Sequence, residues 1–249
     1  MNSHKRFPAS LSAIKVLFED DTILVLDKPS GLLVLPDRYD PSIPNLKSLL
    51  EEDRGQIYVV HRIDRETSGV IIFAKTEESH RSLNSQFESR ATEKEYLAIC
   101  RGDAQNPEGD VDLPLSEDRA KRGKMRVDRT DGKKAITKYS VVEQFNRFTL
   151  IEAEPRTGRT HQIRVHLSAV DLPILGDSLY GGGKGFFLSE IKPVYRKKAE
   201  EKPLLDRTAL HAFRISINHP TTNQRISFEA DLPKDMRIVL NYLRKFRGR

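Results

Sequence analysis

The stretch His61-Arg-Ile-Asp-Arg-Glu-Thr-Ser-Gly69 leads directly into Val70-Ile-Ile-Phe-Ala74. The second segment is apolar at every position, a pattern typical of a strand buried on both faces of a sheet. The first segment is polar and ends in Thr, Ser and Gly, which are common in turns. Asp64 stands between Arg62 and Arg65, and neighbouring guanidinium groups favour the ionised form of a carboxylate. We therefore expect a central strand preceded by a loop that presents a charged aspartate.

Two interpretations of Asp64 follow from this setting. A loop aspartate commonly closes a turn by accepting hydrogen bonds from nearby backbone N–H groups. An ionised aspartate can also act as a nucleophile or a base at neutral pH without a metal ion. The residues of the loop alone leave both interpretations open.

Most of the remaining chain has strand-like alternation or helical spacing. The expected strands are Ile14–Phe18 and Thr22–Leu26, which form a hairpin, then Lys94–Cys100, Ala135–Val142, Arg147–Glu154, Leu210–Ile217 and Gln224–Glu229. The expected helices are Glu77–Arg90, in which Leu83 and Phe87 share a face, His161–Val170, for which Thr157-Gly158 suits the entry, and about residues 235–247, capped by Asp235. Because strands outnumber helices without a regular βαβ repeat, we expect an α+β fold. It would be a single domain, residues 1–249, with a mixed, mainly antiparallel central sheet and flanking helices.

Two charged segments interrupt this pattern. Residues 116–134 are crowded with Lys and Arg and contain the turn signal Asp131-Gly132, so we expect an exposed basic excursion from the sheet. Residues at about 184–207 are also highly charged, and we expect a surface insertion or loop there.

Composition narrows the class of protein and its compartment. The chain has 42 Lys and Arg residues against 36 Asp and Glu, and this formal charge of +6 favours a polyanionic partner without identifying one. Cys100 is the only cysteine, which excludes an internal disulfide or a thiolate metal cluster within one chain. No apolar stretch approaches the ~20 residues of a membrane-spanning helix, and the polar start lacks a signal-peptide core. We therefore expect a cytoplasmic protein that does not use a membrane.

The nine residues His61–Gly69 resemble the central motif of the RluA family of RNA pseudouridine synthases. Other segments resemble the remaining motifs of that family, in the same order along the chain: Leu26–Gly31, Lys94–Tyr96, Arg156–His166 with Pro173–Asp177, and Leu210–His211 through His219–Pro220. The resemblance covers roughly residues 14–230 and is to the short form without an S4 domain. It implies a mixed central sheet with a cleft across it.

The resemblance also implies an activity. Members of the family are isomerases that cleave the N-glycosidic bond of a uridine, rotate the uracil, and rejoin C1′ of the ribose to C5 of the base. The resemblance implies no cofactor and no metal, and the Gly181–Gly185 cluster lacks P-loop spacing. The implied partner is structured RNA, either a ribosomal RNA stem-loop, a tRNA anticodon arm or both. We expect the protein to be a monomer.

Five residues match functional positions of the family. Asp64 would be the catalytic carboxylate, acting either by attack at C1′ or by removal of the C2′ proton. Arg164 would pair with Asp64, and Tyr96 would stack on the extruded uracil. Arg62 would fill the space that the flipped nucleotide leaves, and Leu210 would form one wall of the uracil pocket. Without the resemblance, these residues have ordinary interpretations as core or surface side chains.

RNA phosphates would be bound by cations of the basic excursion, for which a solvated run of charge is the alternative interpretation. The candidates are Arg119, Lys121, Arg122, Lys124, Arg126 and Arg129. Five histidines also lie in motif segments, but their spacing does not match a zinc site, so we expect hydrogen-bonded structural roles. They are His61, His161, His166, His211 and His219.

Two other function classes remain as alternatives. A catalytically silent RNA-binding or RNA-folding module would keep the basic surface and perform no reaction. A hydrolase with Asp64 as its nucleophile would need a second acid/base carboxylate or a metal ion, and neither stands out in the sequence.

Overall fold

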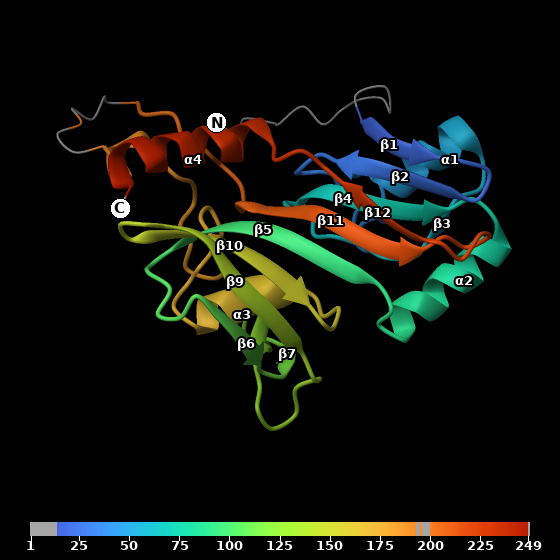
Figure 1. The fold of residues 1–249 in the computed structure, drawn as a ribbon, viewed down its shortest axis with the longest axis horizontal. Helices are drawn as coiled ribbons and strands as arrows, with labels where there is room; N and C mark the ends of the chain where they lie inside the picture. Colours follow the sequence, from blue (N-terminus) through green and yellow to red (C-terminus); the bar gives the residue numbers. More distant parts are fainter. Residues whose placement is uncertain (1–13, 193–194, 196–199, 249) are drawn as a thin grey trace. The chain divides into compact units, whose positions relative to one another are not determined.

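The computed structural model describes residues 14–192, 195 and 200–248. Their helices and strands are coloured along the chain in Figure 1. Contacts divide the described residues into two compact units, one within Met1–Lys94 and Ala212–Asp231, the other within Glu95–His211 and Leu232–Arg249. The single domain expected from the sequence therefore stays a prediction.

The first unit is built around β4 (Ser68–Ala74), whose seven residues are all buried. β2 (Ile23–Lys28) pairs with β4 in antiparallel register from Ile23 opposite Ala74 to Lys28 opposite Gly69, and β1 (Lys15–Glu19) pairs with β2. The strands that complete this part of the sheet are β3 (Tyr58–Val59), β11 (Leu210–Asn218) and β12 (Arg225–Glu229). The central buried strand and the hairpin before it are confirmed.

Gly69 marks a close approach of two backbones in this unit. Its φ is +114°, and a Cβ atom at this position would lie 2.1 Å from the carbonyl oxygen of Ala212. Only glycine combines this conformation with this space. The last residue of the motif His61–Gly69 is therefore glycine for a packing reason.

Two helices flank the strands of the first unit. In α2 (Glu77–Glu88), Leu83 is buried and Phe87 packs on the same apolar cluster, as the spacing predicts. α1 (Leu46–Arg54) was not expected, although the side chain of Asn45 caps it by accepting a hydrogen bond from the backbone N–H of Ser48.

The second unit contains four antiparallel strands in the order β5 (Glu93–Arg101), β10 (Phe148–Pro155), β9 (Ile136–Phe145) and β6 (Glu108–Asp112). The core of this unit also contains apolar residues of α3 (Gln162–Ala169) and α4 (Lys234–Arg247). A short 3-10 helix, η2, covers Leu188–Glu190. Strands outnumber helices among the described residues, and the named strand pairs are antiparallel, so the α+β prediction is confirmed.

A small hairpin forms part of the basic excursion. β7 (Leu115–Glu117) pairs with β8 (Met125–Val127), and the backbone N–H of Gly132 donates to the carbonyl of Asp128, 3.0 Å away. The expected turn near Gly132 is thus present. Most residues of the excursion are exposed.

The starts of two helices differ from the predictions. α4 follows Pro233, so Asp235 lies in its first turn and not at the cap position; its carboxylate binds Arg207 and also accepts from the backbone N–H of Met236 at 2.8 Å. α3 covers Gln162–Ala169, within the expected range His161–Val170, but it begins after His161, whose φ is +53°, so Thr157-Gly158 is not its entry. The Thr157 hydroxyl instead accepts from the backbone N–H of Ile136 and donates to the Gln162 side chain, so it joins a strand to the helix.

The prediction that residues 184–207 form a surface insertion is also wrong for part of this segment. Phe186, Ile191 and Leu205 are buried, and the backbone N–H of Phe186 donates to the carbonyl of Leu205 at 2.7 Å. Residues 193–194 and 196–199 lie outside the described residues. These apolar residues anchor a charged segment to the core. Among the described helices none has both the length and the apolar character needed to cross a membrane.

Candidate active site

The loop that carries Asp64 is fixed at its first residue by His61. The Nε2 atom of His61 accepts a hydrogen bond from the backbone N–H of Ile72 at 3.0 Å, and its ring stacks on Phe87 at 4.8 Å between centroids. Burial, and secondarily the positive charge of Lys94, lowers the pKa of His61 to about 3. His61 is therefore neutral at neutral pH and carries its proton on Nδ1.

The middle of the loop is held by the turn that follows β2. The backbone N–H of Gly31 donates to the carbonyl of Arg65 at 2.7 Å, and Nε of Arg65 donates to the carbonyl of Gly31 at 2.9 Å. The Ser30 hydroxyl donates to the carbonyl of Glu66 at 2.7 Å. Two motifs separated by about thirty residues in sequence thus form one hydrogen-bonded framework.

Lys28 is at the centre of this framework. Its side chain is fully buried, and Nζ donates to the carbonyls of Pro29 at 2.9 Å, Leu32 at 2.8 Å and Arg65 at 3.2 Å. A buried ammonium group needs such acceptors because its loss of hydration is costly. The sequence identifies this lysine only as part of a turn, and its role in holding the Asp64 loop was missed.

Exposure alternates along the loop. Ile63 is buried, whereas Arg62 is exposed and Asp64 is partly exposed. Ile63 therefore anchors the backbone in the apolar interior and leaves the two functional candidates at the surface of the unit. The backbone N–H of Thr67 donates to the carbonyl of Asp64 at 3.1 Å, which closes the turn before β4.

The other catalytic candidates belong to the second unit. Tyr96 is partly buried on β5 opposite Ala153 of β10, and Leu210 is buried at the start of β11. Arg164 lies on α3 and is only 7% exposed. That these residues form one site with Arg62 and Asp64 stays a prediction.

Arg164 has a carboxylate partner that was not predicted from the sequence. Its Nε lies 2.7 Å from Oδ2 of Asp177 and its Nη2 lies 2.9 Å from Oδ1, a bidentate ion pair between buried groups. This geometry fixes the plane of the guanidinium. The signal was present, because Asp177 ends the motif Pro173–Asp177 and a buried arginine requires a carboxylate. The expected pair between Arg164 and Asp64 stays a prediction.

Tyr180 connects α3 to the basic hairpin. Its hydroxyl oxygen accepts from the backbone N–H of Met125 at 2.8 Å and lies 2.8 Å from Nδ1 of His161. Its ring lies 5.1 Å from the guanidinium carbon of Arg164. Tyr180 was not singled out from the sequence, and it places β8 against the start of the helix that carries Arg164.

The basic hairpin presents its cations to solvent. Five of the six candidates are exposed, and Lys124 is partly buried with its Nζ 5.9 Å from the centroid of the Tyr180 ring. Arg126 pairs with Asp128, which also accepts from the Ser116 hydroxyl and so joins the two ends of the hairpin. The exposed cations are Arg119, Lys121, Arg122, Arg126 and Arg129.

Four of the five histidines in the motif segments make hydrogen bonds, as expected, and the role of His211, which is buried, stays a prediction. His166 contacts the Thr137 hydroxyl and the Leu113 carbonyl, each at 2.9 Å, and burial lowers its pKa. The bonds of His61 to Ile72 and of His161 to Tyr180 are of the same kind. No cluster of three or more His, Cys, Asp or Glu side chains suited to a metal ion is found in the described part of the chain.

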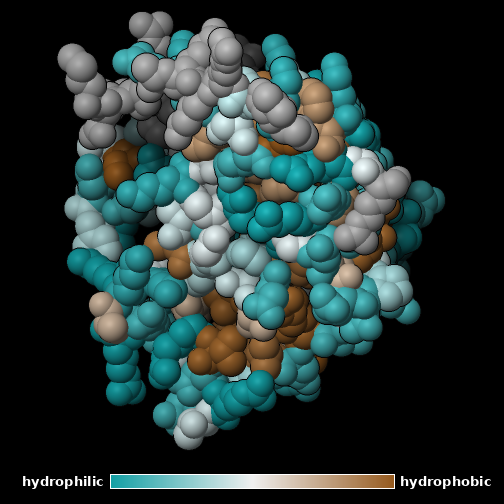
Figure 2. Space-filling model, turned by 90° about the vertical axis from the view of Figure 1, so that its left-hand side faces the viewer, coloured by the Kyte–Doolittle hydropathy of each residue, from teal (hydrophilic) through white to brown (hydrophobic). Residues whose placement is uncertain are grey.

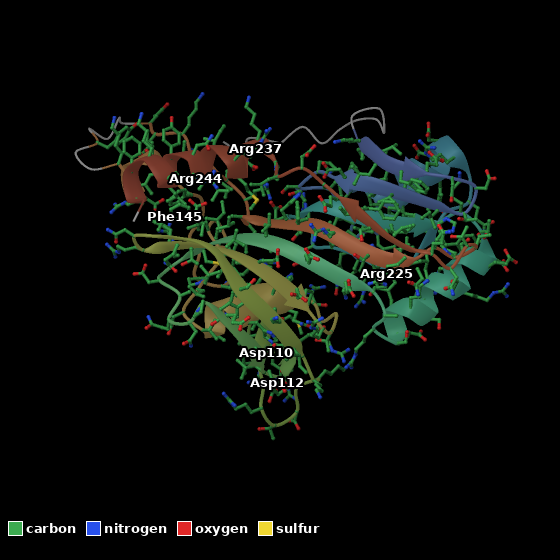
Figure 3. All side chains as sticks on the ribbon, viewed as in Figure 1. Asp110, Asp112, Phe145, Arg225, Arg237 and Arg244 are labelled. Atoms are coloured by element: carbon green, nitrogen blue, oxygen red, sulfur yellow. The ribbon has the colours of Figure 1, made fainter. Side chains whose placement is uncertain are left out.

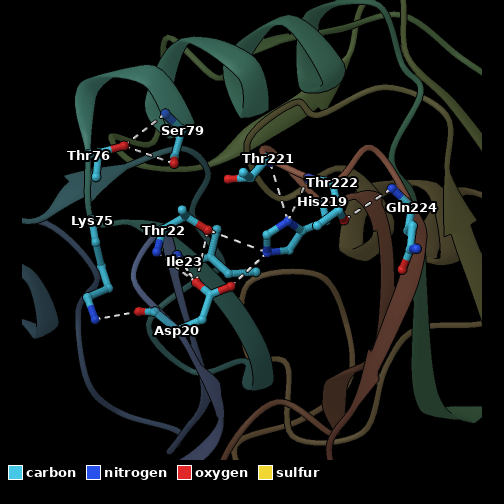
Figure 4. A network of polar contacts seen from close by, with 10 residues as sticks. All are labelled: Asp20, Thr22, Ile23, Lys75, Thr76, Ser79, His219, Thr221, Thr222 and Gln224. Atoms are coloured by element: carbon cyan, nitrogen blue, oxygen red, sulfur yellow. Dashed lines mark hydrogen bonds and ion pairs between the residues drawn. The ribbon is translucent and has the colours of Figure 1, made fainter.

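His219 joins two turns of the first unit (Figure 4). Its Nε2 lies 2.7 Å from Oδ2 of Asp20, and its Nδ1 accepts from the backbone N–H groups of Thr221 and Thr222 at 3.3 Å. Asp20 also accepts from the backbone N–H groups of Thr22 and Ile23. Desolvation opposes ionisation of Asp20, but these hydrogen bonds outweigh it and lower its pKa to about 2. The last motif thus ties the β11–β12 turn to the β1–β2 turn.

Comparison with known proteins gives a consistent result. The family model described as RNA pseudouridylate synthase matches residues 22–169. The chain is 37% identical over 237 residues to ribosomal large subunit pseudouridine synthase D of Xanthomonas campestris pv. campestris, covering 93% of this chain and 70% of the relative. It is 35% identical over 240 residues to the uncharacterized RNA pseudouridine synthase YlyB of Bacillus subtilis, covering 93% and 73%. Among solved structures, human RNA pseudouridylate synthase domain containing 4 is similar with a TM-score of 0.68, 27% identity and 92% coverage of both chains.

Proposed function

Since this chain belongs to the RNA pseudouridylate synthase family and is an RNA-modifying isomerase, we propose that it converts uridine in a large-subunit ribosomal RNA stem-loop, with Asp64 as the catalytic carboxylate. The observation that carries the proposal is the framework around the Asp64 loop. Lys28, Gly31 and His61 hold the backbone of the loop, while the residue Asp64 remains partly exposed. Relatives named ribosomal large subunit pseudouridine synthase D support that substrate class. A tRNA anticodon arm is the other target that the proposal allows.

The reaction that we propose rearranges atoms without a net change in composition. The bond between N1 and C1′ breaks, a bond between C5 and C1′ forms, C5 loses a proton, and N1 gains one. Asp64 would begin this sequence either by attack on C1′ or by removal of the C2′ proton. Neither route needs a redox cofactor, because the substrate and the product are isomers.

The other site residues would act around this carboxylate. Tyr96 would stack on the extruded uracil, since an aromatic face recovers part of the stacking that flipping removes, about 1–3 kcal/mol per base. Arg164, oriented by its bidentate pair with Asp177, would present further donors to Asp64. Leu210 would form a wall of the uracil pocket, and Arg62 would occupy the space left in the RNA helix.

The basic hairpin would hold the RNA backbone. Its exposed cations suit phosphate contacts, which position an RNA without reading its sequence. Tyr180 and Asp128 hold the base of the hairpin in place. Its cations would therefore be positioned before the RNA binds. As parts of the same proposal, we place the activity in the cytoplasm and assign it to a single chain.

Two measurements test the proposed function. Release of tritium from RNA labelled at C5 of uridine detects the isomerisation, because C5 loses its hydrogen only when the base is rejoined. Binding without release would indicate the silent RNA-binding module, and release of free uracil or RNA fragments would indicate a hydrolase. Mass-spectrometric mapping of RNA from cells that lack the gene identifies the target. We expect the loss of a pseudouridine in large-subunit ribosomal RNA, whereas loss in tRNA alone would exclude the proposed substrate class.

A further inference from the structure

Two segments account for the positive charge of this protein. Residues 116–134 contain eight Lys or Arg against four Asp or Glu, and α4 contains five Lys or Arg against one Asp. The formal charge of the whole chain is +6, so the remainder of the chain carries a small excess of negative charge. The first segment is the proposed phosphate grip of the active site. The second segment has no assigned function.

α4 presents its cations on one face. Met236, Val239, Leu240 and Leu243 are buried against the core of the second unit, which leaves the opposite side of the helix to solvent. Figure 3 labels Arg237 and Arg244 along this helix. The exposed charged side chains follow helical spacing and are Lys234, Arg237, Arg244 and Lys245.

The acidic groups near this face already have partners. Asp235 is bound to Arg207, and Glu143 binds Arg244 with its shortest distance at 2.7 Å. Within the described residues, no ion pair is formed by Lys234, Arg237 or Lys245. Among the residues that the structure describes, no carboxylate therefore neutralises the positive charge of these three side chains.

Partly exposed aromatic rings lie beside these cations. The rings of Tyr242 and Phe246 are nearly parallel, with centroids 6.1 Å apart and an interplanar angle of 9°. Nζ of Lys245 lies 5.5 Å and Nζ of Lys192 5.9 Å from the centroid of Phe246. Cations interleaved with aromatic rings suit RNA, because the cations bind phosphates and a ring face can stack on an unpaired base.

We propose that the exposed face of α4, formed by Lys234, Arg237 and Lys245 with Lys192 and Phe246, is a second RNA-binding surface that contacts phosphates outside the modified stem-loop. The inference rests on the proposed function only in taking RNA as the polyanion. An anionic membrane surface fits less well, because the apolar face of α4 is buried in the core and cannot insert among lipids. Figure 2 shows one side of the molecule, where hydrophilic residues surround a smaller group of hydrophobic ones.

The surface should make a defined contribution to binding. Removing one phosphate contact to single-stranded or duplex RNA lowers the slope of log K against log salt by roughly 0.7–0.9. Three contacts should therefore contribute a slope of about 2. The contribution should appear with long RNA, which extends beyond the stem-loop, and should be small with a short hairpin.

The test compares two triple variants with the same change in charge. Lys234→Gln with Arg237→Gln and Lys245→Gln removes the cations of α4, and glutamine preserves helix propensity. Lys15→Gln with Lys47→Gln and Arg81→Gln removes three cations of the first unit and is the control. Circular dichroism and thermal unfolding of each variant establish that the fold is retained.

The probes are a transcript of about 500 nucleotides of large-subunit ribosomal RNA and a hairpin of about 20 nucleotides, with binding measured between about 50 and 200 mM salt. We expect the α4 variant to bind the transcript at least ten-fold more weakly, with a slope reduced by about 2, and to bind the hairpin within about two-fold of wild type. An affinity and slope for the transcript equal to those of the control variant would overturn the inference. Tritium release distinguishes the two proposals. Failure of release from any RNA would overturn the proposed function, whereas the binding measurements alone decide whether α4 is a second RNA-binding surface.

Discussion

Nζ of Lys28 lies 3.2 Å from the carbonyl oxygen of Arg65, the residue that follows Asp64. The same buried ammonium group donates to the carbonyls of Pro29 and Leu32, so one side chain holds both the turn after β2 and the loop before β4. The buried ammonium group of Lys28 thus holds in place the loop that carries the exposed side chains of Arg62 and Arg65. The position of Asp64 depends on a residue that need not contact the substrate.

Replacing Lys28 with methionine should disturb this framework. The carbonyl groups of Pro29, Leu32 and Arg65 each lose one hydrogen-bond donor, and we expect the free energy of unfolding to fall by roughly 2 kcal/mol. The rate of tritium release should fall as well, because the Asp64 loop is less well ordered. Urea unfolding measures the first effect, with Lys47→Met on the partly exposed face of α1 as the control. Unfolding indistinguishable from wild type would contradict the role of Lys28.

Gly69→Ala tests the close approach between β4 and β11. The new Cβ would lie 2.1 Å from the carbonyl oxygen of Ala212 in a backbone with φ of +114°, so the strands must separate. We expect the free energy of unfolding to fall by roughly 3 kcal/mol or more, or insoluble protein. Gly55→Ala is the matched control, because its φ is +77° and no atom lies within 4 Å of its Cβ position. Its cost should be only that of the backbone conformation, about 1–3 kcal/mol, because ψ at Gly55 is −149°. Equal unfolding midpoints for the two variants would show that the contact is unimportant.

Tyr180→Phe removes one hydroxyl group and keeps the ring. Met125 then loses a hydrogen-bond acceptor and His161 loses a partner, so the basic hairpin should be less firmly attached to α3. We expect KM for RNA to rise several-fold with little change in kcat, and stability to fall by about 1 kcal/mol. Tyr139→Phe, at another buried tyrosine of the second unit, is the control. A fall in kcat at unchanged KM would instead indicate a direct part in the reaction.

Asp20→Asn should produce a stability difference that depends on pH. Because the folded protein lowers the pKa of Asp20 from 3.8 to about 2, the ionised carboxylate stabilises the fold above pH 3.8. This contribution falls as the pH decreases from 3.8 towards 2. At pH 7 we expect the variant to be less stable by about 1 kcal/mol, since the group is partly exposed. Urea unfolding at several pH values measures the difference, with Asp21→Asn as the control. A difference that stays constant down to about pH 2 would show that ionisation of Asp20 is not its source.

Local patterns predicted the elements that carry the Asp64 loop. β4 is an uninterrupted apolar segment, and the hairpin before it is bounded by acidic turn residues, so both could be read directly. α1 was missed although Asn45 is a capping residue, because the short helix follows a segment rich in Pro and Asp. Asp235 was misassigned because an acidic residue near a helix start also suits an ion pair with a distant arginine.

The partners of the site residues were harder to predict for a physical reason. Arg164 and Asp177 are 13 residues apart, and Lys28 and Arg65 are 37 apart, so the chain must fold before either pair forms. Sequence identifies a charged residue in a motif but not the direction of its side chain. Tyr180 shows the same limit, because its hydroxyl partners lie on β8 and at the start of α3.

Tritium release by the Asp64→Asn variant tests the central claim most directly. Asparagine has nearly the size of aspartate but is a poor nucleophile and a poor base, so the chemistry should stop while the fold and RNA binding persist. Asp53→Asn, on the exposed end of α1, is the control and should release tritium at the wild-type rate. We predict no release above background from purified Asp64→Asn that binds RNA within about two-fold of wild type. Sustained turnover by that purified variant would contradict the assignment of Asp64 as the catalytic carboxylate.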